Sequence, residues 1–327
     1  MLRAALALVL ALSFLAAPVT ADAQQRGKTW RVGFLSGNAR PPDGAVPSVL
    51  RQALKELGYV EGQNVAYVGR WADARQERLP GLATELVGEK VDVIVTAGGP
   101  ATAASRQATS TIPIVMALVG DADGLGLINS LAHPGGNVTG VTDQSAELSA
   151  KRLEILKEAV PKAERIAVLW NADDLGMTMR YQNVEKAAQV LRVTVQALGV
   201  REPNDFDVAF AAMTQRRPDA MFLVTDALTL LNRKRVIEFA VTHRIPAMYE
   251  VSIPVQDGGL MSYGASPDEN YRRAASYVDR IFKGATPSSL PVERPSRYYL
   301  AINLRTAKAL GLTLPQTLLL RADQIVE

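Results

Sequence analysis

The 327-residue sequence contains no cysteine. This absence excludes disulfide bonds, thiolate metal sites, a cysteine nucleophile and a lipid-anchored N-terminal cysteine. Histidine is scarce as well, because only His133 and His243 occur, and both lie in segments that read as solvated loops. We therefore expect no metal site, no cofactor and no catalytic residue.

Sequence motifs of several enzyme classes are also missing. The chain has neither the Gly-x-Ser-x-Gly turn of α/β-hydrolases nor the His-Glu-x-x-His helix of zinc proteases. The segment GFLSGNARPPDG has its glycines at the wrong spacing for a dinucleotide-binding loop. The formal net charge is only +3, from 36 basic and 33 acidic residues without a basic run, so we expect no nucleic-acid partner.

Long apolar runs are confined to the N-terminus. The chain opens with MLRAALALVLALSFLAAPVTADAQQ, in which one early arginine precedes an apolar core and the small-residue triplet Ala21-Asp22-Ala23. This pattern is typical of a secretory signal peptide that is cut after Ala23. No later segment offers the roughly 20 consecutive apolar residues of a membrane-spanning helix. We therefore expect a soluble periplasmic protein that is not lipid-anchored.

From Trp30 onward, apolar runs alternate with amphipathic segments. The strand-like runs are RVGFLSG, NVAYVGRW, VDVIVTAGG and IPIVMALVGD. Apolar residues at helical spacing occur in VPSVLRQALKELGY and ERLPGLATELVGE. This alternation predicts an α/β fold in which parallel strands are joined by crossover helices.

The second part of the chain repeats the first. RIAVLWN at 165–171 mirrors RVGFLSG at 31–37, PDAMFLVTDALT mirrors VDVIVTAGGPAT, and RIPAMYE mirrors TIPIVMA. Three such echoes in the same order predict two similar α/β halves. A helical segment, DENYRRAASYVDRIFKG, and a strand, RYYLAIN, follow them, as expected if the chain crosses back to complete both halves. Two lobes joined by several strands would form a hinge.

The segment TAGGPATAAS at 96–105 directly follows the apolar run VDVIV. Gly98 and Gly99 permit a tight turn, and Pro100 suits the first turn of a helix, so the segment reads as strand, turn and helix. Amides at such a helix start attract anions. No Gly-Lys-Ser/Thr ending follows, so a nucleotide triphosphate is not expected. An anion site and a plain strand-to-helix turn are both consistent with this pattern.

Several segments together resemble a known family of proteins. They are LKELGYVEGQNV, ERLPGLATELV, VDVIVTAGGPATAASRQATSTIPIVMALVGD, LAHPGGNVTG, KRLEILKEAVPKAERIAVLWN, GGLMSYG and INLRTAKALGLTLPQTLLLRADQ. They are similar to the substrate-binding proteins of ABC-type importers, in a family that includes tryptophan- and tyrosine-binding members. The resemblance implies a class I periplasmic binding protein fold, with two Rossmann-like lobes, three hinge crossings and a small ligand trapped between them. It also implies a membrane permease and an ATPase as partners of a monomeric protein.

The expected domain organisation follows from the repeat and from this resemblance. We assign residues 1–23 to the signal peptide. The first lobe is expected to comprise residues 30–143 and 266–285, and the second lobe residues 144–265 and 290–327. The ligand cleft is expected between the lobes.

Ligands of open parallel α/β sheets bind beyond the carboxyl ends of the strands. Applied to the predicted strands, this rule selects candidate residues in both lobes. Those that we predict to bind the ligand are Ser36, Asn38, Gly98, Gly99, Ala101, Thr102, Asp121, Trp170, Asn171, Asp226 and Glu250. The same rule also selects Gly37, Arg70, Trp71, Gly120, Thr225 and Tyr249.

The residue types suggest a ligand with a carboxylate, such as an amino acid or an aromatic amino acid. Ala101 and Thr102 can offer amide donors, and Thr102 a hydroxyl, to the carboxylate. Asp226 and Glu250 can pair with an ammonium group, although Asp226 can equally cap the helix that follows it. Trp170 can stack on a planar ligand or pack between the lobes.

Two other functions remain open at this point. A secreted α/β enzyme could use Asp121 and Asp226 as acid and base across the cleft. A glycosidase-like site would normally need more aromatic residues than the 6% present here. A ligand-sensing protein that signals to a membrane receptor is the other alternative. Turnover of a captured ligand would favour the enzyme, and a neighbouring permease and ATPase would favour the importer.

Overall fold

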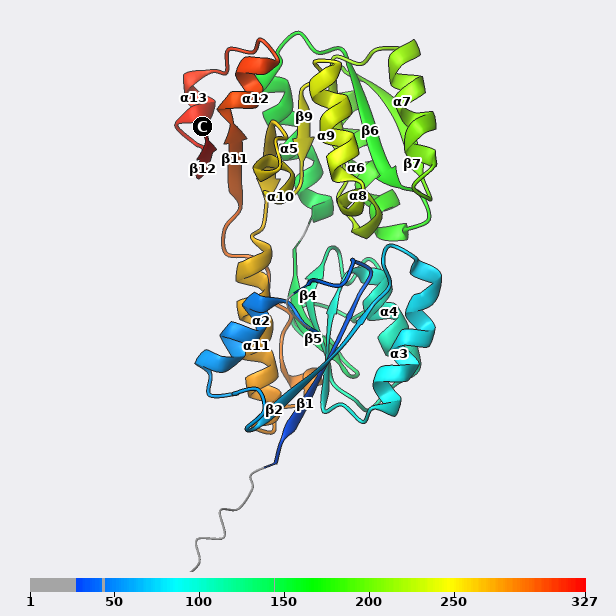
Figure 1. The fold of residues 1–327 in the computed structure, drawn as a ribbon, viewed down its shortest axis with the longest axis vertical. Coiled ribbons are helices and arrows are strands. Elements are labelled where there is room, and N and C mark those ends of the chain that lie inside the picture. Colours follow the sequence, from blue (N-terminus) through cyan, green and yellow to red (C-terminus); the bar gives the residue numbers. More distant parts are fainter. Residues whose placement is uncertain (1–27, 43–44, 144) are drawn as a thin grey trace, which may run out of the picture.

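The structure is a computed structural model that describes residues 28–42, 45–143 and 145–327. It consists of two α/β lobes that follow one another along the long axis of the molecule (Figure 1). The predicted fold class, two α/β lobes with mainly parallel sheets, is confirmed. The predicted signal peptide, with its cleavage site after Ala23, lies outside the described residues.

The first lobe is drawn at the bottom of Figure 1. Its strands are β1 (Trp30–Ser36), β2 (Val65–Trp71), β3 (Val93–Ala97), β4 (Ile114–Val119) and β5 (Val138–Thr142). Its helices are α2 (Ser48–Glu56), α3 (Leu79–Gly88), α4 (Gly99–Ala108) and α11 (Pro267–Phe282), with short 3₁₀ turns η1 (Gln76–Arg78) and η2 (Pro287–Ser289). The five strands form a parallel sheet in the order β2-β1-β3-β4-β5. Helices α2 and α11 pack on one face, and α3 and α4 on the other.

The second lobe is built on a seven-stranded sheet. Its strands are β6 (Arg165–Asn171), β7 (Thr194–Val200), β8 (Ala220–Leu223), β9 (Ala247–Tyr249), β10 (Met261–Gly264), β11 (Tyr299–Asn303) and β12 (Gln324–Val326). Its helices are α5 (Ser145–Ala159), α6 (Leu175–Val190), α7 (Asp205–Gln215), α8 (Ala227–Leu231), α9 (Arg233–Thr242), α10 (Ile253–Gln256), α12 (Leu304–Ala309) and α13 (Gln316–Leu319). Helices α5, α6, α12 and α13 pack on one face, and α7 to α10 on the other.

The two sheets repeat one strand order. The order β2-β1-β3-β4-β5 of the first lobe recurs as β7-β6-β8-β9-β10 in the second. The three pairs of echoed segments form β1 and β6, β3 and β8, and β4 and β9, so each echo lies at the same place in its lobe. The predicted duplication of the α/β half is therefore confirmed.

One strand pair departs from the parallel arrangement. Strands β10 and β11 pair antiparallel, and β12 then pairs parallel to β11. The reason lies in the path of the chain, because β10 leads out of the second lobe toward the first, and β11 begins where the chain returns (Figure 1). A strand that leaves and a strand that returns at the same end of a sheet run in opposite directions.

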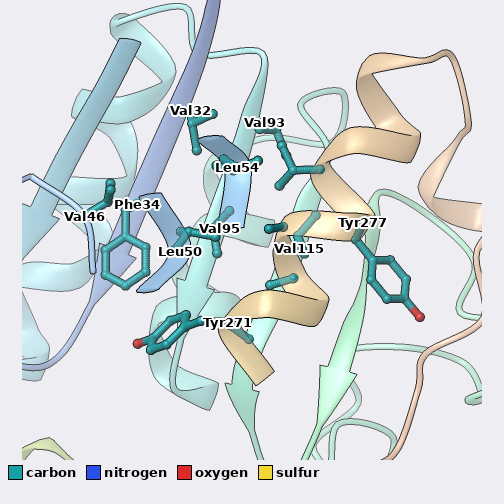
Figure 2. Packing of buried hydrophobic residues seen from close by; sticks show 14 of the residues in the cluster. Val32, Phe34, Val46, Leu50, Leu54, Val93, Val95, Val115, Tyr271 and Tyr277 are labelled. Atoms are coloured by element: carbon teal, nitrogen blue, oxygen red, sulfur yellow. The ribbon is translucent and has the colours of Figure 1, made fainter. Parts of the chain in front are cut away.

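Helix α11 packs in the first lobe although it follows the strands of the second (Figures 1 and 2). It begins after Ser266, whose hydroxyl accepts a hydrogen bond from the amide of Glu269, and Pro267 stands in its first turn. Apolar residues at helical spacing, among them Tyr271 and Tyr277, bury one face of the helix against the sheet. This packing brings the start of α11 to the space between the lobes.

The chain passes between the lobes three times. The crossings lie between β5 and α5, between β10 and α11, and between η2 and β11 (Figure 1). Multi-strand connections of this kind are typical of hinged two-lobe proteins. In the part of the chain that the structure describes, no helix combines the length and the apolar character that a membrane crossing requires.

Candidate ligand-binding site

A cavity of about 280 Å³ lies between the two lobes. Residues that follow β1, β3 and β4, together with the start of α11, form its first-lobe wall, and residues that follow β6, β8 and β9 contribute to its second-lobe wall. The carboxyl ends of both sets of parallel strands thus point to it, as expected for a ligand site in this class of fold. Of the residues that we predicted to bind the ligand, those that line the cavity are Asn38, Gly98, Gly99, Ala101, Asp226 and Glu250. Of the others that the strand-end rule selects, Gly37, Gly120 and Thr225 also line it.

The lobes contact each other around this cavity. A Cβ atom added to Gly37 in the first lobe would lie 3.2 Å from the Cβ atom of Ala227 in the second. The side-chain amide nitrogen of Gln76 lies 3.5 Å from Oδ2 of Asp174. The structure therefore describes the lobes in a closed arrangement.

The turn between β3 and α4 has the predicted form. Gly98 has a φ angle of 102°, which side chains disfavour, whereas Gly99 is already helical. A Cβ atom on Gly99 would lie 3.1 Å from Cδ1 of Leu125, so crowding rather than backbone strain restricts this position. No side chain caps α4, and the amides of Gly99 and Ala101 in its first turn therefore have no intrahelical acceptor. This helix end can bind an anion.

Thr102, which we predicted to bind the ligand, is not among the residues that line the cavity. Its amide and its hydroxyl each donate to the carbonyl oxygen of Gly98 over 3.1 Å. The hydroxyl also lies 2.7 Å from the hydroxyl oxygen of Thr96. Ser36 is likewise buried behind the wall, where its hydroxyl accepts a hydrogen bond from the amide of Asn38 over 3.1 Å. The hydrogen-bonding groups of both predicted residues close local turns instead of facing a ligand.

Asp226 lies at the cavity wall and also caps the helix that follows it. It lines the cavity, and its Oδ1 accepts a hydrogen bond from the amide of Thr229 over 2.9 Å, as the N-cap of α8. Its Oδ2 accepts from Nδ2 of Asn171 over 2.6 Å. Asn171 itself lies outside the cavity wall and holds Asp226 in place. Burial raises the pKa of Asp226, although these hydrogen bonds oppose the shift.

Asp174 is a second acid of the cavity wall, and the sequence reasoning missed it. It is the N-cap of α6, where its Oδ1 accepts from the amides of Gly176 over 2.8 Å and Met177 over 3.3 Å. Burial raises the pKa of Asp174, and the charge of Asp226 raises it further. Ionising both of these carboxyl groups at once is unfavourable, and a cation beside them would stabilise their charged forms. An aspartate ahead of the helical run LGMTMRY was the sequence signal for this residue.

Glu250 reaches the cavity, but its carboxylate is already paired. Its Oε1 accepts from Nη1 of Arg152, and its Oε2 accepts from Nη1 of Arg180, each over 2.8 Å. The amide of Thr225 also donates to Oε2, over 2.9 Å. Glu250, which we predicted to bind the ligand, thus pairs with two buried arginines of its own lobe.

Arg180 lines the cavity as well, and the sequence reasoning missed it too. Its Nη2 lies 3.4 Å from Oδ1 of Asp143, which stands at the first crossing. A Cβ atom on Gly120 would lie only 2.2 Å from that Nη2, so the glycine lets the arginine reach the first lobe. The rule on strand ends does not select Arg180, because it lies inside α6.

The two tryptophans at strand ends pack within their own lobes. The ring of Trp170 stacks on Tyr181, with centroids 3.9 Å apart and planes at 7°. Trp71 contacts Phe34 in the core of the first lobe, with ring centroids 4.8 Å apart. Neither tryptophan lines the cavity, so the structure does not place Trp170 where it could stack on a ligand there. The aromatic side chain that does line the cavity is Tyr271 of α11.

Asp121 also lies away from the cavity. It has a left-handed φ angle of 53° and lines a separate small pocket together with Asp123 and Arg294. It therefore does not face Asp226, and the acid-base pair of the enzyme hypothesis is not formed. Among the described residues there is no group of three or more acidic or histidine side chains that could hold a metal ion.

Known proteins resemble this chain over most of its length. The family described as ABC transporter substrate binding protein matches residues 39–326. A tyrosine-binding protein of Clostridioides difficile strain R20291 is 26% identical over 261 residues, which cover 80% of this chain and 75% of that protein.

Two solved structures share the fold. The ABC domain of Streptococcus pneumoniae in complex with L-Trp is 24% identical, with a TM-score of 0.84 over 91% of this chain and 100% of that chain. A ligand-free, open substrate-binding protein with adhesive properties from Clostridium difficile is 23% identical, with a TM-score of 0.63 over 91% of this chain and 99% of that chain. At similar identity and coverage, the liganded structure superposes better.

Proposed function

The chain belongs to the family of ABC transporter substrate-binding proteins, and on this premise we propose that it captures an amino acid with an aromatic side chain between its lobes. The observation that carries the proposal is a pair of complementary groups on opposite walls of the cavity, which Asp143, Asp268 and Arg180 also line. The first lobe offers the uncapped amides of Gly99 and Ala101, and the second lobe offers the carboxyl groups of Asp174 and Asp226. A zwitterion fits between them, with its carboxylate at α4 and its ammonium group at the acids.

The remaining cavity wall suits an apolar side chain. Aliphatic and aromatic residues from both lobes contribute to it, among them Leu79, Leu118, Leu125, Met177, Leu230 and Tyr271. The volume of about 280 Å³ is near the lower end of small-molecule pockets. Relatives that bind tyrosine or hold L-Trp support an aromatic ligand.

We further propose that the lobes, residues 30–143 with 266–285 and residues 144–265 with 290–327, move as two bodies about the crossings. Only the closed arrangement contacts a ligand from both sides, so a ligand should shift the population toward it. The better superposition on the liganded relative than on the open one supports this view. Small-angle scattering should show a smaller radius of gyration with saturating ligand than without.

The proposed setting is the periplasm. The protein would be exported with cleavage after Ala23, act as a monomer, and deliver its ligand to a membrane permease that an ATPase drives. We propose binding rather than turnover, because Asp121 lines a separate pocket and does not lie opposite Asp226 in the cavity.

Three related compounds test the ligand proposal. L-tryptophan carries both charged groups, tryptamine lacks the carboxylate, and indole-3-propionate lacks the ammonium group. In titration calorimetry we expect each of the two analogues to bind at least about tenfold more weakly than L-tryptophan, because each leaves one wall unpaired. Equal affinity for tryptamine and L-tryptophan would show that the α4 amides do not hold a carboxylate.

A further inference from the structure

Asn270 is a buried side chain with an unused hydrogen-bond donor. It is the fourth residue of α11, it lines the cavity, and it is only 1% exposed. Its Nδ2 has no hydrogen-bond partner among the residues that the structure describes. The helix does not need this side chain as a cap, because Ser266 already caps α11 and accepts the Asn270 amide at its carbonyl oxygen. A buried donor without an acceptor destabilises a fold.

Two other buried asparagines of the described residues use their side-chain amide nitrogen as a hydrogen-bond donor. Asn303, which is 3% exposed, donates from Nδ2 to the carbonyl oxygen of Val255 over 3.1 Å and accepts from the amide of Thr306 over 3.0 Å. Asn232 donates to the carbonyl oxygen of Leu228 over 3.0 Å. Asn270 differs from both in facing the cavity between the lobes.

Thr225 presents a matching group from the opposite wall. It lies between β8 and α8, and its Oγ1 is also buried without a partner among the described residues. Its amide is engaged by Glu250, which fixes the residue at the cavity wall. Each lobe therefore contributes one unpaired polar side-chain group to the same cavity.

We infer that Asn270 is a ligand-binding residue whose Nδ2 donates a hydrogen bond to an oxygen atom of the captured ligand, while the hydroxyl of Thr225 contacts the same ligand from the second lobe. This inference rests on the proposed function and adds two contacts to it. Helices α11 and α4 pack on opposite faces of the first-lobe sheet. The first lobe thus contacts the ligand at two separate places. The amide donors of α4 lie on one side of the sheet, and the Asn270 donor of α11 lies on the other.

This placement also connects the ligand to the hinge. The second crossing ends at Pro267, three residues before Asn270, so the ligand contact lies in the first turn after the crossing. Thr225 belongs to the other lobe, and one ligand can satisfy both groups only when the lobes are closed.

The test uses the full mature chain and the substitution Asn270→Leu, which keeps a similar shape but removes the donor. Thermal shifts with the twenty standard L-amino acids identify the strongest binder, and calorimetry measures its affinity for each variant. We expect Asn270→Leu to bind about tenfold or more weakly, while the melting temperature of the empty protein stays equal or rises, because an unpaired donor has been removed from the interior.

The matched control is Asn303→Leu, which removes an engaged asparagine that does not line the cavity. It should lower the melting temperature and leave the affinity unchanged. Thr225→Val should weaken binding several-fold without a loss of stability. Asn270→Asp, which keeps the size and turns the donor into an acceptor, repeats the test if the leucine variant does not fold.

The outcomes separate this inference from the proposed function. If the wild type responds to none of the amino acids, the proposed function is wrong and the inference falls with it. If the wild type binds and the Asn270 variants bind as tightly, only the inference is wrong. A lower melting temperature with unchanged affinity for Asn270→Leu would show that the residue has a structural role instead.

Discussion

The turn after the third strand of each lobe shows how one architecture serves two chemistries. In the first lobe this turn is Gly98-Gly99, and the amides of the following helix, α4, have no cap. In the second lobe it is Thr225-Asp226, and Asp226 caps α8 in a capping box with Thr229. The same unit of strand, turn and helix thus presents amide donors in the first lobe and a carboxyl group in the second. A duplicated fold acquires complementary walls by changing the residues of a single turn.

The end of the fourth strand differs in the same sense. Gly120 follows β4, whereas Glu250 follows β9. Arg180 contacts both, because its Nη1 donates to Glu250 and its Nη2 lies against Gly120. In the second lobe, Glu250 and Arg180 therefore belong to a buried network of charged side chains. In the first lobe, Gly120 leaves the space that the Arg180 side chain occupies.

The largest expected effect follows from removing the charge of Glu250 from the buried network of the second lobe. Glu250→Gln leaves Arg152 and Arg180 buried beside a neutral side chain, and burial already lowers the pKa of Arg152, which the charge of Glu250 opposes. We expect a loss of about 3–5 kcal/mol in the free energy of unfolding, measured in denaturant. The exposed pair of Arg235 and Asp207 is the control, and Asp207→Asn should change stability by less than about 0.5 kcal/mol. If Glu250→Gln lowered the free energy of unfolding as little as this control, the buried network would not stabilise the fold.

The next effect concerns the carboxyl wall and acts on binding. Asp226→Asn retains the shape and one oxygen but removes a charge beside the proposed ammonium group. Affinity for the amino acid should fall by about tenfold to a hundredfold in calorimetry. Asp219 lies at the opposite end of β8 and accepts from the amides of Glu164 and Arg165. Asp219→Asn should leave affinity unchanged, and an equal loss in both variants would mean that Asp226 acts only through the fold.

A smaller effect is expected on the amide wall. Gly98→Ala forces a side chain into a backbone with a φ angle of 102°, so stability should fall by about 1–2 kcal/mol and ligand affinity should fall with it. Gly81 in α3 is the matched control, because a Cβ atom there meets nothing within 4 Å. Gly81→Ala should raise stability by up to about 1 kcal/mol. Unchanged affinity in Gly98→Ala would show that the turn is not part of the site.

The smallest effect is on pH dependence and concerns the carboxyl groups of the second-lobe wall. The pKa values of Asp174 and Asp226 are raised above the ordinary carboxyl value, so the folded protein holds protons that the unfolded chain has lost. As pH rises from the ordinary value through the raised values, these groups should lower the stability of the empty protein. An ammonium ligand favours the ionised acids, so its affinity should rise over the same interval and its binding should release protons.

Calorimetry in buffers with different ionisation heats measures this proton release. Asp174→Asn should reduce it, and Gly81→Ala should leave it as in the wild type. Proton uptake on binding would contradict the assignment of the ammonium group to these acids.

Local sequence patterns determined the elements and their order. The apolar run of β3, Pro100 in the first turn of α4 and the paired echoes predicted strands, helices and a duplicated fold, and these features are found. Such patterns depend on side-chain periodicity and turn chemistry among residues a few positions apart. The strand-end rule led to the cavity and to several residues of its wall, because the ends of the strands can be recognised from these local patterns.

The roles of individual side chains were decided only by the tertiary structure. Glu250 was predicted to bind the ligand because it follows a strand, and the structure pairs it with Arg180, 70 residues away, and with Arg152, 98 residues away. Asn270 was not considered, because its helix lies in the sequence after the second lobe and packs in the first. A polar group forms hydrogen bonds with the partners that folding brings within about 3 Å of it. Many of these partners come from segments far away in the sequence, and local sequence patterns do not show which segments will pack together.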